Sequence, residues 1–302
     1  MTAPIRVATR GSALALWQAN LVANRLGGPT ELVIVNTRGD RDRTSAIHAI
    51  GGTGVFVKEV QEAVLRGDAD LAVHSAKDLP AEPVDGLTIA AVPERADVRD
   101  ALVGVPFDAI PDGGTVGTGA VRRRAQLAAR RPDLRFAELR GNIPTRVQRA
   151  SEFDAVVVAL AALQRLEMTD AVAEVLDVEV MLPMVGQGAL AVECRTNDER
   201  VAQRLDAIDD QAAHTAVSAE RAFLHALGGG CTMPCGAYAT ITASGGVHLD
   251  AMLATVDGTN LLRTELDGDD PVGVGVAAAR RILDDLGGRA LLAGATSDGS
   301  RR

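Results

Sequence analysis

The segment His74–Pro80, His-Ser-Ala-Lys-Asp-Leu-Pro, places a lysine beside an aspartate after an apolar run. Lys77 and Lys58 are the only lysines in a chain with 31 lysine and arginine residues. A lysine retained among so many arginines indicates a place where a compact ammonium is needed. The pair follows Leu71–Val73, a predicted strand, and open α/β sheets bind ligands at the carboxyl ends of their strands. Lys77 and Asp78 are therefore candidates for acid–base chemistry, with a surface ion pair as the alternative.

A second candidate is Cys231, which follows the three glycines Gly228–Gly230. A glycine run after a predicted helix makes an open loop, so a bulky group can reach this thiol. Structural cysteines usually pack in apolar surroundings instead. Cys235 lies nearby, but no second Cys or His pair follows at the spacing of a metal site, and no metal is expected. An incidental cysteine in a helix cap and a labile thiol pair are the alternatives.

A set of arginines follows two predicted strands in the middle of the chain. Its members are Arg122, Arg123, Arg124, Arg140, Arg146 and Arg165, with Thr118 and Gly119 at a predicted helix start. Backbone N–H groups at a helix start favour anions, and guanidinium groups bind carboxylates through paired hydrogen bonds. The set predicts a ligand with many carboxylates or phosphates. A solvated helix face is the alternative, which explains Arg124 and Arg130 better than Arg140.

The elements that must position these residues alternate along the first two thirds of the chain. Strands are predicted near residues 5–8, 31–35, 71–74, 87–92, 115–118, 134–139 and 154–160, and helices after Ser12 to residue 26 and over 57–65, 121–131 and 145–150. This alternation is typical of parallel or mixed sheets covered by helices. Residues 98–114 and 182–188 resemble two crossings between units, after which residues 188–194 form a strand that returns to the first unit.

The last third of the chain has a different pattern. A long helix is predicted over residues 211–227, then strands near 238–242, 247–254 and 260–266, and a closing helix over 274–286. These elements indicate a small α+β domain. The tail from Ser297 is expected to be disordered, and no convincing internal repeat is found. The predicted fold class is α/β, with two lobes built on mixed sheets and a small C-terminal α+β domain.

Composition excludes several classes of protein. The net charge of −9 argues against nucleic-acid binding through general electrostatics and against a polybasic membrane binder. No apolar run approaches the about 20 residues that span a bilayer, and the N-terminus lacks a signal-peptide pattern. Three cysteines are too few for a disulfide framework, so a reducing cytoplasm is expected.

Taken together, the motifs resemble the porphobilinogen deaminase (hydroxymethylbilane synthase) family. They follow the family order over nearly the whole chain: Ala8–Ser12, Trp17–Gln18, Thr37–Asp40, Phe56–Glu59, His74–Pro80, Arg99–Asp100, Val116–Thr118, Arg122–Arg123, Leu139–Asn142, Thr145–Arg146, Gln187–Gly188, Glu193–Arg195 and the Cys231 loop. The resemblance implies two lobes like those of periplasmic binding proteins, with a cleft between them, and a third domain that carries the cysteine. The expected domains are 1–96 with 189–208, then 97–188, and then 209–302.

The resemblance also implies an activity, that of a transferase in tetrapyrrole (haem-type) biosynthesis. Family members attach a dipyrromethane cofactor to the residue matching Cys231 through a thioether, add four porphobilinogen units with loss of ammonia, and release hydroxymethylbilane by hydrolysis. Asp78 matches the catalytic carboxylate. The matching cofactor-binding positions are Lys77, Asp78, Thr118, Arg122, Arg123, Arg140 and Arg146. The matching substrate-binding positions are Arg10, Ser12, Arg140, Arg146 and Arg165.

The implied protein is a cytoplasmic monomer that takes the small molecule porphobilinogen and has no nucleic-acid or membrane partner. Its product is expected to pass to uroporphyrinogen-III synthase. Some residues depart from the family pattern: Thr53 replaces a common Lys, Gly119 and Ala120 replace a Ser–Ser pair, and Ala162 replaces a Gly. Cys235 is an unusual neighbour of the Cys231 loop. The alternatives are a non-catalytic two-lobe binding protein for a polycarboxylate ligand and an anion-activated regulator, which would need a further domain.

Overall fold

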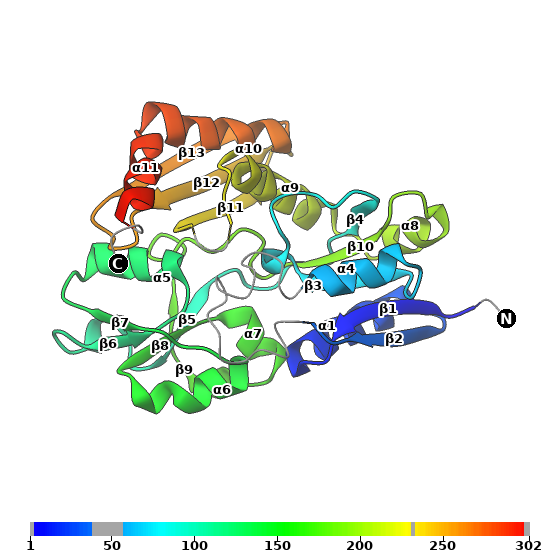
Figure 1. The fold of residues 1–302 in the computed structure, drawn as a ribbon, viewed down its shortest axis with the longest axis horizontal. Coiled ribbons are helices and arrows are strands. Elements are labelled where there is room, and N and C mark those ends of the chain that lie inside the picture. Colours follow the sequence, from blue (N-terminus) through cyan, green and yellow to red (C-terminus); the bar gives the residue numbers. More distant parts are fainter. Residues whose placement is uncertain (1–2, 38–56, 231–232, 299–302) are drawn as a thin grey trace.

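The computed structural model describes residues 3–37, 57–230 and 233–298 of the chain. Within these ranges the strands form two five-stranded mixed sheets and one three-stranded antiparallel sheet (Figure 1). The expected fold class, two mixed-sheet lobes with a small C-terminal α+β domain, is confirmed.

The first sheet has the strand order β2-β1-β3-β10-β4. Its strands are β1 (Ile5–Arg10), β2 (Thr30–Val35), β3 (Leu71–Ser75), β4 (Leu87–Ala91) and β10 (Leu190–Arg195). Strand β10 is antiparallel to β3 and β4, so the predicted return of this segment to the first unit is confirmed. Helices α1 (Ala13–Leu26) and α8 (Glu199–Asp206) pack on one face, and α4 (Lys58–Leu65) packs on the other.

The second sheet has the order β7-β6-β8-β5-β9. Its strands are β5 (Asp100–Gly104), β6 (Thr115–Gly117), β7 (Arg135–Ala137), β8 (Ala155–Ala159) and β9 (Val172–Leu176). Helix α5 (Val121–Arg130) packs on one face, whereas α6 (Ile143–Gln148) and α7 (Leu160–Arg165) pack on the other. In the first sheet, β10 lies antiparallel between β3 and β4, and in the second sheet, β5 lies antiparallel between β8 and β9. In each lobe, the strand that follows a crossing thus lies between the last two of the lobe's other strands in chain order. This topological repeat was not apparent from the sequence.

The third domain is an antiparallel sheet of β11 (Cys235–Ile241), β12 (Val247–Ala254) and β13 (Leu261–Gly268). Helices α9 (Gln211–Ala226) and α10 (Pro271–Arg280) share its hydrophobic core, and a π-helical turn (Arg281–Asp285) and α11 (Gly288–Asp298) follow. Another small apolar cluster joins Met252 and Ala254 of this sheet to Ala125 of α5 and to Leu182. The third domain therefore rests on the second lobe, as Figure 1 shows.

Several elements differ from the prediction. The segment expected to be the first crossing, residues 98–114, contains strand β5, whose initial Asp100 obscures the apolar run behind it. Strand β9 and helices α7 and α8 were also missed. Short 3-10 turns lie at Ala76–Asp78, Phe107–Ala109, Arg149–Glu152 and Thr169–Ala171. The tail prediction is wrong for residues 297–298, which continue helix α11.

In the structure the first crossing is therefore the connection from β4 to β5, residues 92–99, and it runs beside the second crossing. The backbone N–H of Ala96, in the first crossing, donates to the carbonyl of Gly188 in the second, at 3.2 Å. Gly188 has a φ of +84°, and a Cβ there would lie 2.5 Å from the Ala96 carbonyl oxygen. Only glycine suits this close approach. The predicted domain boundaries, 1–96 with 189–208, 97–188 and 209–302, remain a proposal.

Candidate functional site

The His74–Pro80 motif lies where β3, a central strand of the first sheet, ends. Strand β3 finishes at Ser75, and the 3-10 turn Ala76–Asp78 carries the lysine and the aspartate. The Lys77 ammonium donates a hydrogen bond to Gln187 Oε1, on the second crossing, at 3.3 Å. This placement confirms that the motif follows a strand, and it puts Lys77 against the connection to the other lobe.

A small cavity of about 60 Å³ opens beside the motif. Side chains from β1, α1, α4 and β3 line it: Arg10, Ser12, Leu14, Ala15, Gln18, Val57, Val60, Val73, His74, Ser75 and Asp78. The structure thus brings together three residues predicted for the site, Arg10, Ser12 and Asp78. Ser12 also accepts a hydrogen bond from the backbone N–H of Ala15 at 3.3 Å and caps α1, as its sequence position predicted.

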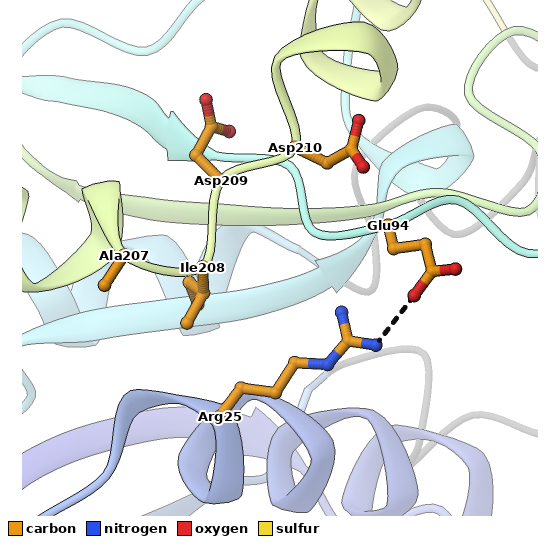
Figure 2. Close-up of a pocket in the computed structure, with 6 residues that line it drawn as sticks. All are labelled: Arg25, Glu94, Ala207, Ile208, Asp209 and Asp210. Atoms are coloured by element: carbon orange, nitrogen blue, oxygen red, sulfur yellow. Dashed lines mark hydrogen bonds and ion pairs between the residues drawn. The ribbon is translucent and has the colours of Figure 1, made fainter.

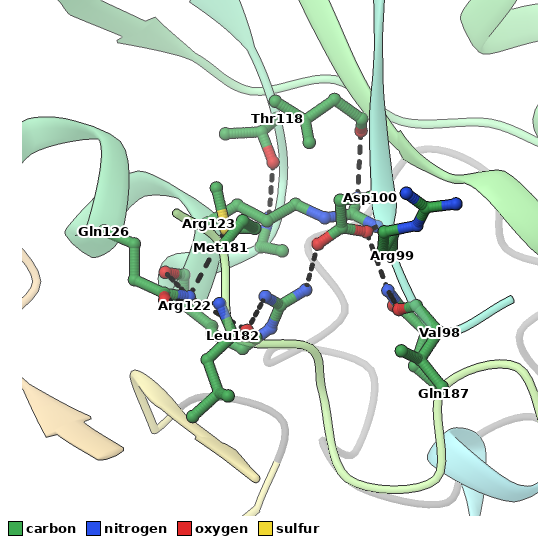
Figure 3. A network of polar contacts seen from close by, with 12 residues as sticks. Val98, Arg99, Asp100, Thr118, Arg122, Arg123, Gln126, Met181, Leu182 and Gln187 are labelled. Atoms are coloured by element: carbon green, nitrogen blue, oxygen red, sulfur yellow. Dashed lines mark hydrogen bonds and ion pairs between the residues drawn. The ribbon is translucent and has the colours of Figure 1, made fainter. Parts of the chain in front are cut away.

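Arg122 and Arg123, in the first turn of α5, point into the protein and share one carboxylate (Figure 3). Their Nη2 atoms lie 2.7 Å from Oδ2 and Oδ1 of Asp100, the first residue of β5. The Nη1 groups donate to backbone carbonyls, that of Leu182 for Arg122 and that of Val157 for Arg123. These two arginines are buried, whereas Arg124 and Arg130 are exposed. The solvated-face alternative is therefore wrong for Arg122 and Arg123 and holds for the other two.

This arginine pair carries more positive charge than its partner neutralises. Burial opposes the ionisation of Asp100, but the charges of Arg123 and Arg122 outweigh it and hold the pKa of Asp100 well below its usual range. One carboxylate then faces two guanidinium groups. Arg123 Nε is buried and has no acceptor among the described residues. A buried donor without an acceptor is costly, so this atom suits a further anionic group.

Lys77 lies beside this charge. Burial, together with the positive charge of Arg123, lowers the pKa of Lys77 to about 8, against the opposing effects of Asp78 and Asp100. Lys77 belongs to the first lobe and Arg123 to the second, and hydrogen bonds through Gln187 and Asp100 connect the two cationic groups. Their mutual repulsion further indicates a region that suits an anion.

Arg140, Arg146 and Thr118 follow the neighbouring parallel strands β6 and β7. Arg140 Nε lies 3.2 Å from Glu138 Oε1, and Arg146 Nε donates to the Gly141 carbonyl at 2.8 Å. Thr118 is buried, and its Oγ1 accepts a hydrogen bond from the Ala120 backbone at 3.2 Å. The carboxyl ends of both strands lie at the same sheet edge, as predicted.

Arg146 links this edge electrostatically to the motif. Burial and the charge of Arg123 lower the pKa of Arg146 to about 10, while the negative charge of Asp78 acts in the opposite direction. Asp78 lies in the first lobe and Arg146 in the second, so the predicted catalytic carboxylate is close enough for its charge to act on Arg146.

Arg165, on α7, contacts the first lobe directly. Its Nη2 donates to the carbonyl of Gly188 at 2.7 Å, and its guanidinium carbon lies 5.6 Å from the centroid of the Trp17 ring, on α1. Burial lowers the pKa of Arg165 to about 10. Arg165 is therefore held at the contact between the lobes.

Two polar residues at the site had no role in the sequence prediction. Asp100 and Gln187 stood within recognised motifs, but nothing in the local sequence showed that a carboxylate and an amide would be buried together. Gln187 Nε2 donates to Asp100 Oδ1 at 2.9 Å and to the Val98 carbonyl at 2.7 Å. A charged residue opening an apolar run, Asp100-Ala-Leu-Val, was the available signal.

Glu193 was also missed as a partner of the motif. Its carboxylate accepts a hydrogen bond from Gln61 Nε2 at 2.9 Å and lies 3.1 Å from His74 Nε2. Arg221, on α9, donates to the Pro80 carbonyl at 3.0 Å. The motif is thus supported from the sheet behind it and from the third domain.

Cys231 and Thr53 lie outside the described residues. Of the other departures from the family pattern, Ala120 is the N-cap residue of α5, Ala162 is buried in α7, and Cys235 is buried at the start of β11. A Cβ on Gly119 would lie 3.1 Å from Glu138 Oε1, so a larger residue there would require Glu138 to move.

A larger, open hollow of about 290 Å³ lies elsewhere, between the end of α1 and the start of α9 (Figure 2). It is lined by Arg25, Glu94, Ala207, Ile208, Asp209 and Asp210, and Arg25 pairs with Glu94 at 3.2 Å. No residue predicted for the site lines this hollow, so the Asp78 region is the candidate site. In the part of the chain that the structure describes, no His, Cys, Asp and Glu cluster could hold a metal ion, and no helix is long and apolar enough to cross a membrane.

Comparisons with known proteins identify the family of the chain. The family model "Porphobilinogen deaminase, dipyromethane cofactor binding domain" matches residues 5–203, and "Porphobilinogen deaminase, C-terminal domain" matches residues 214–284. The chain is 43% identical to a porphobilinogen deaminase of Brevibacillus brevis, covering 92% of this chain and 93% of the relative. It is 45% identical to one of Roseiflexus sp., covering 95% and 98%.

Solved structures match the chain more distantly. The VFT2 domain of Bordetella pertussis BvgS has 17% sequence identity and a TM-score of 0.40, with 72% of this chain and 91% of that domain covered. The sequence matches extend over both lobes and most of the third domain. The chain therefore belongs to the porphobilinogen deaminase family, whose members include a domain that binds a dipyrromethane cofactor.

Proposed function

We propose that this chain is a transferase that joins four porphobilinogen molecules head to tail on a dipyrromethane held by Cys231. Each addition releases ammonia, and hydrolysis then releases hydroxymethylbilane for tetrapyrrole biosynthesis. Family membership supports the activity and the cofactor. A non-catalytic binding protein is not favoured, because the match to this family covers both lobes and the third domain.

The observation that carries the proposal is the meeting of Asp78 with a cationic region. Asp78 lines the cavity that also contains Arg10 and Ser12, and its charge acts on Arg146 of the other lobe. Each porphobilinogen bears an acetate and a propionate. The cationic groups therefore suit the substrate's carboxylates, while Asp78 is left to act on the pyrrole ring.

The residues present fit a dipyrromethane. The buried Nε of Arg123 lacks an acceptor among the described residues, and the neighbouring cluster carries net positive charge, as a ligand with several carboxylates requires. We assign the binding of these carboxylates to Lys77, Arg123, Arg140 and Arg146, with Thr118 at the same edge. When bound, the dipyrromethane supplies the pyrrole carbon to which porphobilinogen is joined.

Asp78 has the catalytic role in this proposal. Loss of ammonia breaks the bond between the aminomethyl carbon of porphobilinogen and its nitrogen, and leaves positive charge on the substrate's pyrrole. A nearby carboxylate stabilises that charge and can hold the proton lost from the pyrrole carbon when the new bond forms. Arg10, Ser12 and Arg165 complete the proposed substrate-binding residues.

The oligomeric state, the cellular location and the fate of the product are also proposed. We infer a monomer in the cytoplasm, where the buried thiols of Cys194 and Cys235 would stay reduced. The product is proposed to pass to uroporphyrinogen-III synthase.

Intact mass spectrometry with Ehrlich's reagent tests the proposal. The wild-type chain should be heavier than its sequence by two linked pyrroles, and it should react with the reagent. The Cys231→Ser variant should have the mass of its sequence and give no colour, whereas Cys235→Ser should remain loaded. A covalent pyrrole on the Cys231→Ser variant would place the attachment on Cys235 or Cys194 and refute the assignment.

A further inference from the structure

Asp100 is a fully buried carboxylate that accepts hydrogen bonds from three side chains (Figure 3). Its Oδ2 accepts from Arg122 at 2.7 Å, and its Oδ1 accepts from Arg123 at 2.7 Å and from Gln187 at 2.9 Å. The donors come from α5 in the second lobe and from the second crossing. The carboxylate thus joins the second lobe to the connection between the lobes.

Each donor is also held at a second point. Arg122 is bonded to the Leu182 carbonyl, Arg123 to the Val157 carbonyl at 2.9 Å, and Gln187 to the Val98 carbonyl at 2.7 Å. A guanidinium or amide fixed at two points has a determined plane.

Gln187 extends the network to the first lobe. While its Nε2 donates to Asp100, its Oε1 accepts from the Lys77 ammonium at 3.3 Å. A continuous chain of hydrogen bonds therefore runs from Lys77 through Gln187 to Asp100 and the two arginines.

We propose that Asp100 is the positioning residue of this site, an internal anion that orients Arg122 and Arg123 and, through Gln187, the Lys77 ammonium. The proposal rests on the proposed function and deepens it by dividing the arginines into two kinds. Both arginines bond Asp100 and a backbone carbonyl through their Nη groups, but Arg123 also has a buried Nε without an acceptor among the described residues. Arg122 is therefore assigned a structural role, and Arg123 is the arginine with hydrogen-bonding capacity left for a ligand.

Charge balance explains why an internal anion is needed. Without Asp100, two buried guanidinium groups and a lysine would face one another with only Asp78 to offset them. The charged groups that act on Lys77 are Arg123, Asp78, Asp100 and Arg122, and the two carboxylates favour its charged form. With burial, their balance brings the pKa of Lys77 to about 8. Asp100 therefore contributes to keeping Lys77 cationic at neutral pH.

The chain offers a direct measurement, because Lys58 and Lys77 are its only lysines. Protein labelled with ¹³C at the lysine Cε gives two side-chain resonances, which a Lys58→Arg variant assigns. The full-length chain is titrated in a Cys231→Ser background, so that no variant differs in covalent pyrrole content. We expect the Lys77 resonance to titrate near pH 8.

Asp100→Asn should move this titration to lower pH. We expect the ratio of charged to neutral Lys77 at pH 8 to fall at least about threefold, which corresponds to half a pH unit. Gln187→Met, which removes the hydrogen-bond acceptor of the Lys77 ammonium, should also shift the titration to lower pH. This variant tests the proposal if Asp100→Asn does not fold. Asp100→Glu, which keeps the charge, should shift it less than Asp100→Asn.

The matched control is Asp250→Asn, which removes another buried carboxylate paired with an arginine, Arg263, within the third domain. It should destabilise the fold without moving the Lys77 titration. An unchanged titration in Asp100→Asn, or in Gln187→Met where Asp100→Asn is unfolded, would overturn the proposal. Ehrlich's reagent on the wild-type chain reports separately on the proposed function, because its result does not depend on Asp100.

Discussion

The carboxylate of Glu220 and the guanidinium of Arg95 form a buried ion pair with two hydrogen bonds, of 2.6 and 3.0 Å. Arg95 lies on the first crossing, and Glu220 lies on α9 of the third domain. Glu220 also accepts hydrogen bonds from the backbone N–H groups of Gly186, on the second crossing, and Ala239, on β11. One side chain therefore ties the third domain to both crossings.

Glu220→Gln should destabilise the chain strongly. The amide keeps the shape but removes the charge and places a donor where the carboxylate accepts four hydrogen bonds. Breaking a buried pair typically costs about 3–5 kcal/mol, because the remaining charge stays buried. Urea unfolding of wild type and variant measures the free-energy difference.

Asp267→Asn is the control for this experiment, because Asp267 pairs with His248 on the exposed surface. Exposed pairs contribute about 0–1 kcal/mol. A loss in Glu220→Gln no larger than in the control would show that the buried pair does not hold the domains together.

The Lys77 pKa of about 8 predicts an alkaline fall in activity. Below pH 8 the ammonium is charged and can bind a substrate or cofactor carboxylate, and above pH 8 this attraction is lost. We expect kcat/KM to decrease as pH rises through about 8 in the wild-type chain. Lys77→Arg keeps its positive charge and should move this decrease to higher pH. An alkaline limb unchanged in Lys77→Arg would assign it to another group.

The same pKa predicts an opposite effect on stability. The folded-state pKa of about 8 is below the ordinary value of 10.5, so the unfolded chain binds more protons between these values. The free energy of unfolding contributed by Lys77 therefore rises with pH through this window. The advantage of Lys77→Met over the wild type should shrink from pH 8 to pH 10 in urea unfolding. A difference independent of pH would contradict the shifted pKa.

Trp17 is the only tryptophan in the chain, and it lies under the Arg165 guanidinium at the contact between lobes. Its fluorescence therefore reports on this contact. Arg165→Leu removes both the cation and the hydrogen bond to Gly188, so we expect acrylamide to quench Trp17 more strongly. Arg124→Leu, which removes a similar cation over Phe136 within the second lobe, is the control. Equal quenching in wild type and Arg165→Leu would exclude the contact in solution.

Local patterns were sufficient to predict much of this molecule. Strand β3 was recognisable because an apolar run precedes Lys77 and Asp78, and Ser12 marked the start of α1 by its capping side chain. The shared edge of Thr118 and Arg140 followed from consecutive strands. In each case the determining interactions are short-range in sequence or follow from strand order.

Long-range burial could not be predicted in the same way. Asp100 pairs with Arg122 and Arg123, which lie 22 and 23 residues further along the chain. Because Asp100 is charged and is the first residue of β5, the apolar pattern of that strand was not recognised. The common strand order of the two lobes arises from backbone pairing, which different apolar side chains can satisfy equally. The hydrogen bonds from Arg122 to Leu182 and Asp100 depend on how α5 packs against the second crossing. That packing is a feature of the tertiary structure, which local sequence does not reveal.

The central claim is that Asp78 stabilises the positive charge that forms on the pyrrole as ammonia leaves. Asp78→Asn keeps the shape of the side chain but removes its charge and its ability to accept a proton. General acid–base help is typically worth about 10²–10⁴-fold, so the variant should turn over porphobilinogen at least ~100-fold more slowly. Asp78→Glu keeps the charge and should retain more activity.

Steady-state product formation by purified, dipyrromethane-loaded wild type, Asp78→Asn and Asp78→Glu is the most direct measurement. We predict loading of both variants, with activity in the order wild type, Asp78→Glu, Asp78→Asn. Equal activity of the two variants, or an Asp78→Asn rate close to that of the wild type, would contradict the account and leave Asp78 as a structural neighbour of Lys77.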